Sequence, residues 1–262
     1  MPIYRGSGVA IITPMKSDCS VNYEKLEELI NFNIDNGTDA IIVVGTTGEC
    51  STLSEEEHVN CIRKTVEFTK GRIPVIAGTG SNCTATSKTL TKEAMECGAD
   101  AALIVSPYYN KSTQKGLKKH YSEIADTCDI PIILYNIPGR TGVNIFPETI
   151  AELINTKKNI VGVKEATGDF AQVARVMNLT DGKAEFYSGE DGMIIPLLSI
   201  GGHGVISVMA NIIPQDTHDM IQAFFDGDVK KAMEMQWKAT PLVDPLFCEV
   251  NPIPVKEAMN LM

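Results

Sequence analysis

One lysine interrupts a stretch that otherwise has the composition of a buried strand. In IVGVKEATG, residues 160–168, three of the four residues before Lys164 are apolar and β-branched. Such a run is typical of a parallel strand that is covered on both faces. Lysine is rarely buried without a specific reason. Lys164 therefore either ends the strand with its ammonium in water or paired with Glu165, or it lies in a cavity where its amine does chemistry.

Other residues with chemical capacity follow the remaining predicted strands. Thr46, Thr47 and Glu49 follow the second strand, Tyr108 and Tyr109 the fourth, Tyr135 and Arg140 the fifth, and Ser188 and Gly189 the seventh. With the lysine they provide an amine nucleophile, hydroxyl groups that carry protons, a guanidinium for a carboxylate and exposed backbone N–H groups. Each of them alone is also typical of a strand end: the threonines suit turns, and an arginine suits a surface ion pair.

Schiff-base formation is the chemistry that uses this set of groups. A neutral lysine amine attacks a ketone, water leaves, and the imine draws electrons from the neighbouring carbon. An apolar cavity would keep the amine neutral by disfavouring its charged form. If the fifth and sixth strands are neighbours, the phenol of Tyr135 can reach the amine of Lys164 and carry the proton for dehydration and hydrolysis.

Eight strand–helix units support this placement. We predict strands at 9–12, 40–44, 74–77, 101–105, 131–135, 160–165, 185–187 and 205–208, each followed by a helical pattern. Asn22 is predicted to cap the first helix, and Ser54 with Glu57 forms a capping box before the second. Regular alternation argues for a parallel sheet, and eight units argue for a closed (β/α)8 TIM barrel, whose active site lies at the carboxyl ends of the strands.

An open doubly wound sheet is the alternative architecture. It would carry G-x-G-x-x-G after its first strand, and the chain has neither that motif nor a phosphate-binding P-loop. We therefore predict a catalytic barrel over residues 1–225 and a small C-terminal helical appendage over residues 226–262.

Composition narrows the possible partners. The chain has 262 residues, 44% of them hydrophobic, and a net charge of −10, which disfavours nucleic acid and anionic membranes. It has no apolar run of about 18 residues that would predict a membrane span. The seven cysteines, odd in number and without C-x-x-C spacing, predict free thiols in a reducing cytoplasm. The four histidines are scattered and have no ligand spacing, so we expect neither a structural nor a catalytic metal.

Six motifs resemble those of the dihydrodipicolinate synthase family, in the same order and over nearly the whole chain. They are GTTGE (45–49), SPYYN (106–110), ILYNIPGRTG (133–142), VGVKEATG (161–168), GGHGVIS (201–207) and NPIPVK (251–256). The resemblance implies a (β/α)8 barrel and a lyase. Its reaction would condense pyruvate with L-aspartate-4-semialdehyde to give 4-hydroxy-tetrahydrodipicolinate, in diaminopimelate and lysine biosynthesis.

The resemblance also implies four catalytic residues. Lys164 matches the lysine that forms the Schiff base with pyruvate, so no separate cofactor is implied. Tyr135 resembles the acid/base tyrosine, and Thr46 the threonine that links two tyrosines in a proton relay. Tyr109 resembles the relay tyrosine that a neighbouring subunit donates. A homo-oligomer, either a dimer or a dimer-of-dimers tetramer, is therefore expected.

Four further positions match substrate-binding residues of the family. Thr47 resembles the residue that binds the carboxylate of pyruvate through its hydroxyl and N–H. Arg140 resembles the arginine that receives the carboxylate of the aldehyde substrate. Gly189 and Ile206 resemble residues whose backbone lines the pocket.

Two other functions remain open at this stage. One is an N-acetylneuraminate lyase or another 2-keto-acid aldolase, which would share the barrel, the lysine and the tyrosine. Arg140 favours the synthase, because the sugar-acid lyases typically lack an arginine there. The other is a catalytically inactive barrel that binds a small keto acid and acts as a regulator.

The sequence departs from the family pattern in two places. His58, Asn82 and Tyr108 match an effector site at which lysine inhibits some members, but Thr86 replaces a glutamate there and Glu55 replaces a histidine. We therefore expect weak or absent inhibition by lysine. The chain also stops at its residue 262, whereas members usually continue for a few tens of residues, so we expect a truncated or unusually short form with a less certain tetramer.

Overall fold

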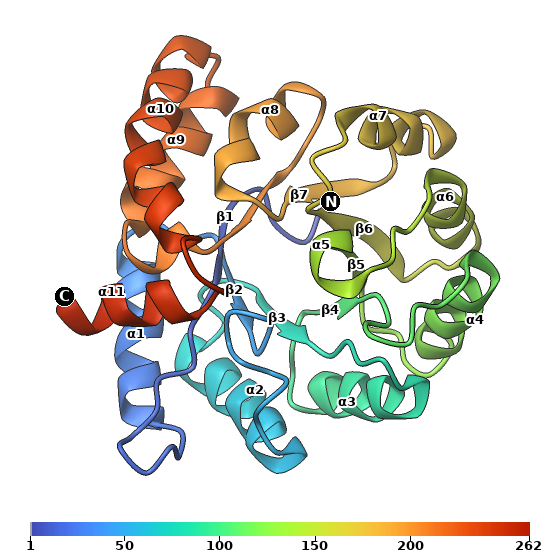
Figure 1. The fold of residues 1–262 in the computed structure, drawn as a ribbon, viewed down its shortest axis with the longest axis horizontal. Coiled ribbons are helices and arrows are strands. Elements are labelled where there is room, and N and C mark those ends of the chain that lie inside the picture. Colours follow the sequence, from blue (N-terminus) through green and yellow to red (C-terminus); the bar gives the residue numbers. More distant parts are fainter. Residues whose placement is uncertain (1) are drawn as a thin grey trace.

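The strands of the computed structural model, which describes residues 2–262, form a closed parallel barrel (Figure 1). They are β1 (Gly6–Ala10), β2 (Ala40–Val43), β3 (Val75–Gly78), β4 (Ala101–Val105), β5 (Ile132–Asn136), β6 (Ile160–Glu165), β7 (Glu185–Ser188) and β8 (Gly204–Ser207). Each strand pairs in parallel with the next, and β8 pairs with β1 to close the ring. The predicted (β/α)8 barrel is confirmed.

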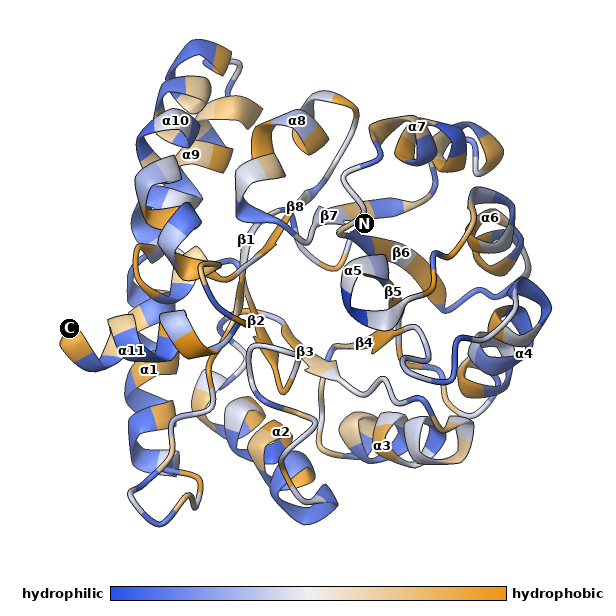
Figure 2. Ribbon diagram, in the orientation of Figure 1, coloured by the Kyte–Doolittle hydropathy of each residue, from blue (hydrophilic) through white to orange (hydrophobic). Residues whose placement is uncertain are grey.

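Helices surround the barrel on its outside. They are α1 (Tyr23–Asp35), α2 (Glu55–Thr69), α3 (Thr84–Glu96), α4 (Gln114–Ala125), α5 (Pro138–Thr141), α6 (Pro147–Thr156), α7 (Phe170–Leu179), α8 (Ile194–Ser199), α9 (Pro214–Phe225), α10 (Val229–Leu246) and α11 (Ile253–Leu261). Two short 3-10 turns, η1 (Asp191–Met193) and η2 (Met209–Asn211), follow β7 and β8. Figure 2 shows hydrophobic and hydrophilic residues alternating along these helices, as expected for elements with one buried face.

Both predicted helix caps are present. The Asn22 side-chain oxygen accepts a hydrogen bond from the backbone N–H of Lys25 at 3.1 Å. Ser54 and Glu57 form the reciprocal capping box, with Glu57 N–H donating to Ser54 Oγ at 3.2 Å and Ser54 N–H donating to Glu57 Oε2 at 2.9 Å. These bonds satisfy N–H groups that would otherwise lack partners in the first turns of α1 and α2.

The first strand begins earlier than the sequence predicts. The apolar run pointed to residues 9–12, but β1 starts at Gly6, which pairs with Gly204 of β8. Backbone pairing between two glycines leaves no hydrophobic signature, so the apolar pattern missed this end of the strand. The strand also ends two residues earlier than predicted, and the predicted ends of the other strands match the observed ones to within one residue.

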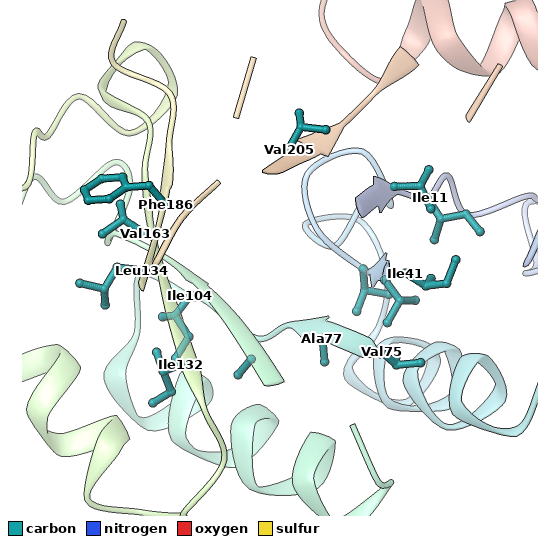
Figure 3. Close-up of a cluster of buried hydrophobic side chains, with 14 of the residues drawn as sticks. Ile11, Ile41, Val75, Ala77, Ile104, Ile132, Leu134, Val163, Phe186 and Val205 are labelled. Atoms are coloured by element: carbon teal, nitrogen blue, oxygen red, sulfur yellow. The ribbon is translucent and has the colours of Figure 1, made fainter. Parts of the chain in front are cut away.

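The strand side chains divide into two buried layers. Figure 3 shows residues that pack between the strands and the helices, among them Leu134, Val163 and Phe186. The residues that alternate with them along each strand, such as Tyr135 after Leu134 and Tyr187 after Phe186, belong to a second cluster in the barrel interior. Because side chains of a strand alternate between its two faces, Lys164, which follows Val163, is directed to the interior side.

Two tyrosines fill the barrel interior. The rings of Tyr4 and Tyr187 stack with centroids 4.4 Å apart, and Tyr4 Oη donates to the carbonyl of Val205 at 2.8 Å. Gly8 leaves room for this arrangement, because a Cβ there would lie 2.5 Å from Tyr4 Oη. The interior is therefore a packed core rather than a channel.

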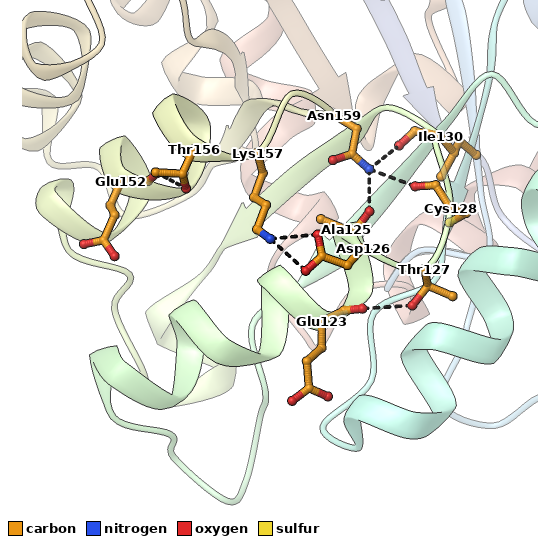
Figure 4. A network of polar contacts seen from close by, with 10 residues as sticks. All are labelled: Glu123, Ala125, Asp126, Thr127, Cys128, Ile130, Glu152, Thr156, Lys157 and Asn159. Atoms are coloured by element: carbon orange, nitrogen blue, oxygen red, sulfur yellow. Dashed lines mark hydrogen bonds and ion pairs between the residues drawn. The ribbon is translucent and has the colours of Figure 1, made fainter.

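An asparagine fixes the start of β5 and β6 (Figure 4). Asn159 Nδ2 donates to the carbonyls of Ala125 and Cys128 at 3.0 and 2.9 Å, and its own backbone carbonyl accepts from Ile132 N–H at 2.6 Å. The turn before β6 is thereby bound to the segment that leads into β5. These two strands carry Tyr135 and Lys164. The network therefore helps to fix the position of the two strands relative to each other, and with it the position of the two side chains.

The last two helices lie beside the barrel at the side of α9 and α1 (Figure 1). The segment between α10 and α11 contains Asn251, whose side chain is buried. Throughout residues 2–262, helices of the length and apolar character needed to cross a membrane do not occur.

Candidate active site

Lys164 and Tyr135 lie side by side on neighbouring strands. They are register partners in the β5–β6 ladder, and Lys164 Nζ lies 4.4 Å from the centroid of the Tyr135 ring. Each residue is only 6% exposed. The two strands are neighbours as predicted, and the Tyr135 ring lies beside the amine.

Burial changes the acid–base behaviour of Lys164. Loss of water around the amine lowers the pKa of Lys164 from 10.5 to about 8, the nearby Arg140 charge acts in the same direction, and the Asp191 carboxylate opposes both. Near pH 8 a substantial fraction of the amine is therefore neutral. A neutral amine has the free electron pair that nucleophilic attack needs.

Lys164 adopts neither of the two non-catalytic arrangements considered above, an ammonium in water or an ion pair with Glu165. Its side chain is not at the surface, and the neighbouring Glu165 does not pair with it. Glu165 Oε1 instead accepts a hydrogen bond from the backbone N–H of Thr167 at 2.6 Å. Because consecutive side chains of a strand point to opposite faces, the two charged groups are held apart.

Tyr135 is held as a neutral phenol. Burial raises the pKa of Tyr135, while the charge of Arg140 and the nearby side chain of Thr46 oppose the shift. A protonated phenol next to a neutral amine can donate a proton to a leaving hydroxyl group.

Gly189 makes room for the lysine side chain. A Cβ at this position would lie 3.2 Å from Lys164 Cε and 2.8 Å from the Cβ of Ala166. The Gly189 N–H donates to the carbonyl of Glu165 at 2.7 Å, which holds the end of β7 against β6. Ile206, on β8, is buried in the interior layer that also contains Tyr135.

A cluster at the mouth of the barrel joins Thr47 and Arg140 through Asn251. Asn251 Nδ2 donates to Thr47 Oγ1 at 3.0 Å, and Arg140 Nη2 donates to the backbone carbonyl of Asn251 at 3.2 Å. Asn251 lies in the NPIPVK motif, so sequence reasoning had marked the segment but had assigned it no function. The partner residues are more than 100 positions away along the chain.

Tyr109 is the one predicted catalytic residue that lies apart from this group. Its side chain is 91% exposed, and its backbone adopts a φ of 71°, in the left-handed region that non-glycine residues rarely occupy. The loop that carries it is tied to the loop between β3 and α3 by a hydrogen bond from Asn110 Nδ2 to the carbonyl of Asn82 at 3.0 Å. The Tyr109 ring is therefore almost fully in solvent, unlike Lys164 and Tyr135.

The residues expected at an effector site differ in their exposure to solvent. His58 is buried, and its Nε2 contacts the carbonyl of Gly78 at 2.8 Å. Burial lowers the pKa of His58. Thr86 is half-buried and Glu55 is exposed.

Sequence reasoning missed one buried carboxylate, Asp191. Its Oδ2 accepts hydrogen bonds from the N–H groups of Val208 and Met209 at 3.1 and 2.8 Å, which ties the end of β7 to the end of β8. Burial raises the pKa of Asp191, and its charge raises that of Lys164. The tetrapeptide SGED after the seventh predicted strand was the signal that could have pointed to it.

The thiol of Cys50, in the loop after β2, is not activated by its surroundings. Burial raises the pKa of Cys50, so its thiol resists ionisation. In the part of the chain that the structure describes, there is no group of three or more side chains suited to hold a metal ion. The chemistry that the geometry supports is attack of a neutral amine on a carbonyl, with a phenol as proton carrier.

Comparison with known proteins identifies relatives of the whole chain. The model of the dihydrodipicolinate synthetase family matches residues 4–262. The 4-hydroxy-tetrahydrodipicolinate synthase of Lachnoclostridium phytofermentans is 56% identical over 262 residues, which cover 100% of this chain and 89% of that protein.

Solved structures agree with this result. Dihydrodipicolinate synthase from Aquifex aeolicus superposes with a TM-score of 0.95 at 46% identity and covers 97% of this chain and 87% of its own. The chloride-inhibited dihydrodipicolinate synthase from Acinetobacter baumannii, complexed with pyruvate, gives a TM-score of 0.95 at 46% identity. That match covers 98% of this chain and 88% of the other.

The depressed pKa of Lys164 predicts a cost in stability. The unfolded chain binds the proton more tightly than the folded chain, so the unfolding free energy falls as the pH drops from about 10.5 to about 8 and stays low below that. Replacing Lys164 by methionine removes this cost. We expect Lys164→Met to raise the unfolding free energy at pH 7 by roughly 1–3 kcal/mol, as measured by urea unfolding.

The pH dependence separates this effect from improved packing. The gain is expected to shrink as the pH rises through 8 toward 10.5, where the amine is neutral in both states. Lys230→Met serves as the control, because that side chain is 88% exposed and its replacement carries no such pH-dependent gain. A gain for Lys164→Met that is constant between pH 7 and pH 10 would contradict the lowered pKa.

Proposed function

The chain belongs to the dihydrodipicolinate synthetase family, and we propose on that premise that it condenses pyruvate with L-aspartate-4-semialdehyde to give 4-hydroxy-tetrahydrodipicolinate. The observation that carries the proposal is the buried amine of Lys164, with its pKa lowered to about 8, beside the neutral phenol of Tyr135. The reaction is a lyase-class step of diaminopimelate and lysine biosynthesis.

Lys164 and Tyr135 divide the first half of the reaction between them. The neutral amine of Lys164 adds to the keto carbon of pyruvate and forms a carbinolamine. Its hydroxyl group leaves as water after taking a proton, which the Tyr135 phenol can supply. The resulting imine withdraws electrons from the methyl carbon, and loss of a proton there gives the enamine that attacks the aldehyde carbon of the second substrate.

The two substrate carboxylates have separate places in the proposal. Thr47, buried at the end of β2, binds the carboxylate of pyruvate, and Arg140, exposed at the mouth, binds the carboxylate of the semialdehyde. Gly189 and Ile206 line the wall beside Lys164. Thr46 passes protons to and from Tyr135, in agreement with the effect of its side chain on the pKa of the phenol.

A 2-keto-acid aldolase of another kind would use the same lysine and tyrosine. The relatives that are at least half identical to this chain are named 4-hydroxy-tetrahydrodipicolinate synthases, and this does not favour the sugar-acid alternative. The cysteines are all free, consistent with a reducing cytoplasm as the place of action.

Borohydride trapping tests the enzyme proposal. Pyruvate with sodium borohydride is expected to convert Lys164 to a stable secondary amine that carries the pyruvate carbons, located by peptide mass spectrometry. Lys164→Met is expected to show no adduct and no turnover. Tyr135→Phe is expected to form the adduct with kcat lowered by about 10²-fold, because only the proton carrier is lost.

Product analysis separates the two aldolase functions. Enzyme that has not been treated with borohydride is supplied with pyruvate and L-aspartate-4-semialdehyde in one assay and with pyruvate and N-acetylmannosamine in a second, and products are identified by mass. Turnover of the sugar alone would replace the synthase assignment. Absence of any adduct at Lys164 would instead favour a regulatory keto-acid-binding barrel.

We also propose that the chain works as a homo-oligomer in which Tyr109 enters the site of a neighbouring copy. The exposure of the two tyrosines supports this arrangement. The Tyr109 side chain is almost completely exposed, whereas Tyr135 is buried in the site. A large aromatic side chain fixed by an unfavourable backbone conformation suits a contact with another chain. The assembly would be a dimer or a dimer of dimers.

Mixed oligomers test the origin of Tyr109. Chains with Lys164→Met and chains with Tyr109→Phe are co-expressed with different tags, and the mixed species is purified. Activity well above that of either pure variant is expected, because the first chain donates its intact Tyr109 to the intact Lys164 site of the second. Activity no higher than in the pure variants, or full activity in a sedimenting monomer, would place the tyrosine in its own chain.

Lysine is expected to inhibit weakly or not at all. The effector ammonium needs a carboxylate, and Thr86 offers only a hydroxyl at that position. Initial rates with increasing L-lysine provide the measurement, and Thr86→Glu is the matched variant that should gain inhibition. Half-inhibition of the unmodified chain below about 1 mM, an affinity of about 4 kcal/mol or more, would show that another group receives the ammonium.

A further inference from the structure

Asn251 reaches the mouth of the barrel from outside the strand–helix units. We propose that the side-chain amide of Asn251 is a positioning group that sets the direction of the Thr47 hydroxyl, so that this hydroxyl donates its hydrogen to the carboxylate of pyruvate. The inference rests on the proposed function and assigns to Asn251 a part that is separate from the Schiff-base chemistry.

The contact is short and shielded from water. Asn251 Nδ2 lies 3.0 Å from Thr47 Oγ1, and the two residues are 6% and 2% exposed. Within residues 2–262 this amide is the hydrogen-bond partner of the Thr47 hydroxyl. A buried hydroxyl with one fixed partner has few orientations left.

The amide orientation determines what the hydroxyl can do. With Nδ2 toward Thr47, the hydroxyl oxygen accepts a hydrogen bond, and its own hydrogen must be directed elsewhere. The reverse orientation would place the amide oxygen on Thr47 and leave an NH2 group with two donors buried without an acceptor. The observed orientation gives one of these N–H groups an acceptor and leaves the other N–H and Oδ1 without a partner, so one donor rather than two stays unpaired.

The backbone of Asn251 acts on a different group. Its carbonyl accepts a hydrogen bond from Arg140 Nη2 at 3.2 Å. The side chain thus contacts the proposed pyruvate site, while the main chain contacts the proposed semialdehyde site. Replacing the side chain leaves the carbonyl in place, so the two substrates should respond differently.

A second bond fixes the segment that carries Asn251. Lys256 Nζ, at the start of α11, pairs with Glu49 Oε1 at 2.5 Å, and both side chains are about three-quarters buried. Glu49 lies two residues after Thr47 in the same loop. The loop after β2 is therefore bound to the C-terminal segment at two points, which gives the amide a defined position.

Two substitutions test the proposal by steady-state kinetics. Asn251→Asp keeps the shape but replaces the donor by an acceptor, so the Thr47 hydroxyl turns toward position 251 and away from pyruvate. Asn251→Ala removes the partner. We expect the KM for pyruvate to rise at least roughly tenfold in both, as for loss of a hydrogen bond to a charged group, and the KM for the semialdehyde to change less than about twofold.

A double-mutant cycle shows whether the effect passes through Thr47. Thr47→Val removes the hydroxyl and keeps the shape. In that background Asn251→Ala is expected to change the KM for pyruvate by less than about twofold, because the group it directs is already absent. An equal factor in both backgrounds, or a parallel rise in both KM values, would overturn the proposal and leave Asn251 as a structural residue.

Matched controls separate this inference from the proposed function. Asn260→Asp adds the same charge to an exposed position of α11 and should leave both KM values unchanged. Wild-type chain that fails to turn over the two substrates contradicts the proposed function. If the wild-type chain turns over both substrates but the KM for pyruvate is unaltered in both Asn251 variants, the proposed function stands and the role of Asn251 is contradicted. Thermal unfolding verifies that each variant is folded. If Asn251→Ala does not fold, the isosteric Asn251→Asp variant alone decides the test.

Discussion

An ammonium ion placed in an apolar interior loses its water shell, and Lys164 occupies such a place at the end of β6. The charged neighbours do not abolish that cost but adjust it, since Arg140 lowers the pKa of the amine and Asp191 raises it. The result is an amine that is neither permanently charged nor fully neutral near pH 8. Reactivity and instability therefore have one origin, the missing solvent around a single nitrogen.

The barrel determines where this nitrogen lies. Strand register places Tyr135 beside Lys164, and the absence of a side chain at Gly189 leaves space for the lysine stem. Hydrogen bonds from Asn159 hold the opposite ends of the same two strands. Groups that act at the mouth are positioned from further away, by a segment that follows all eight strands.

The sequence predicted the barrel because strand–helix alternation is a local pattern that repeats eight times. It predicted Lys164 because a charged residue in an apolar run contradicts local preference, and contradictions of that kind mark functional sites. It gave no function to Asn251, whose partner Thr47 is 204 positions away. Asp191 was also missed, since carboxylates at strand ends are common and its burial depends on the packing of β7 against β8. The exposure of Tyr109 cannot be read from its motif, because SPYYN does not encode which way a loop faces.

The stacked rings of Tyr4 and Tyr187 limit the direction from which a small molecule can reach Lys164. The packed rings close the barrel interior at the end where the strands begin, so the barrel is not an open tube. A molecule that reaches the amine of Lys164 must therefore approach from the end where the strands finish.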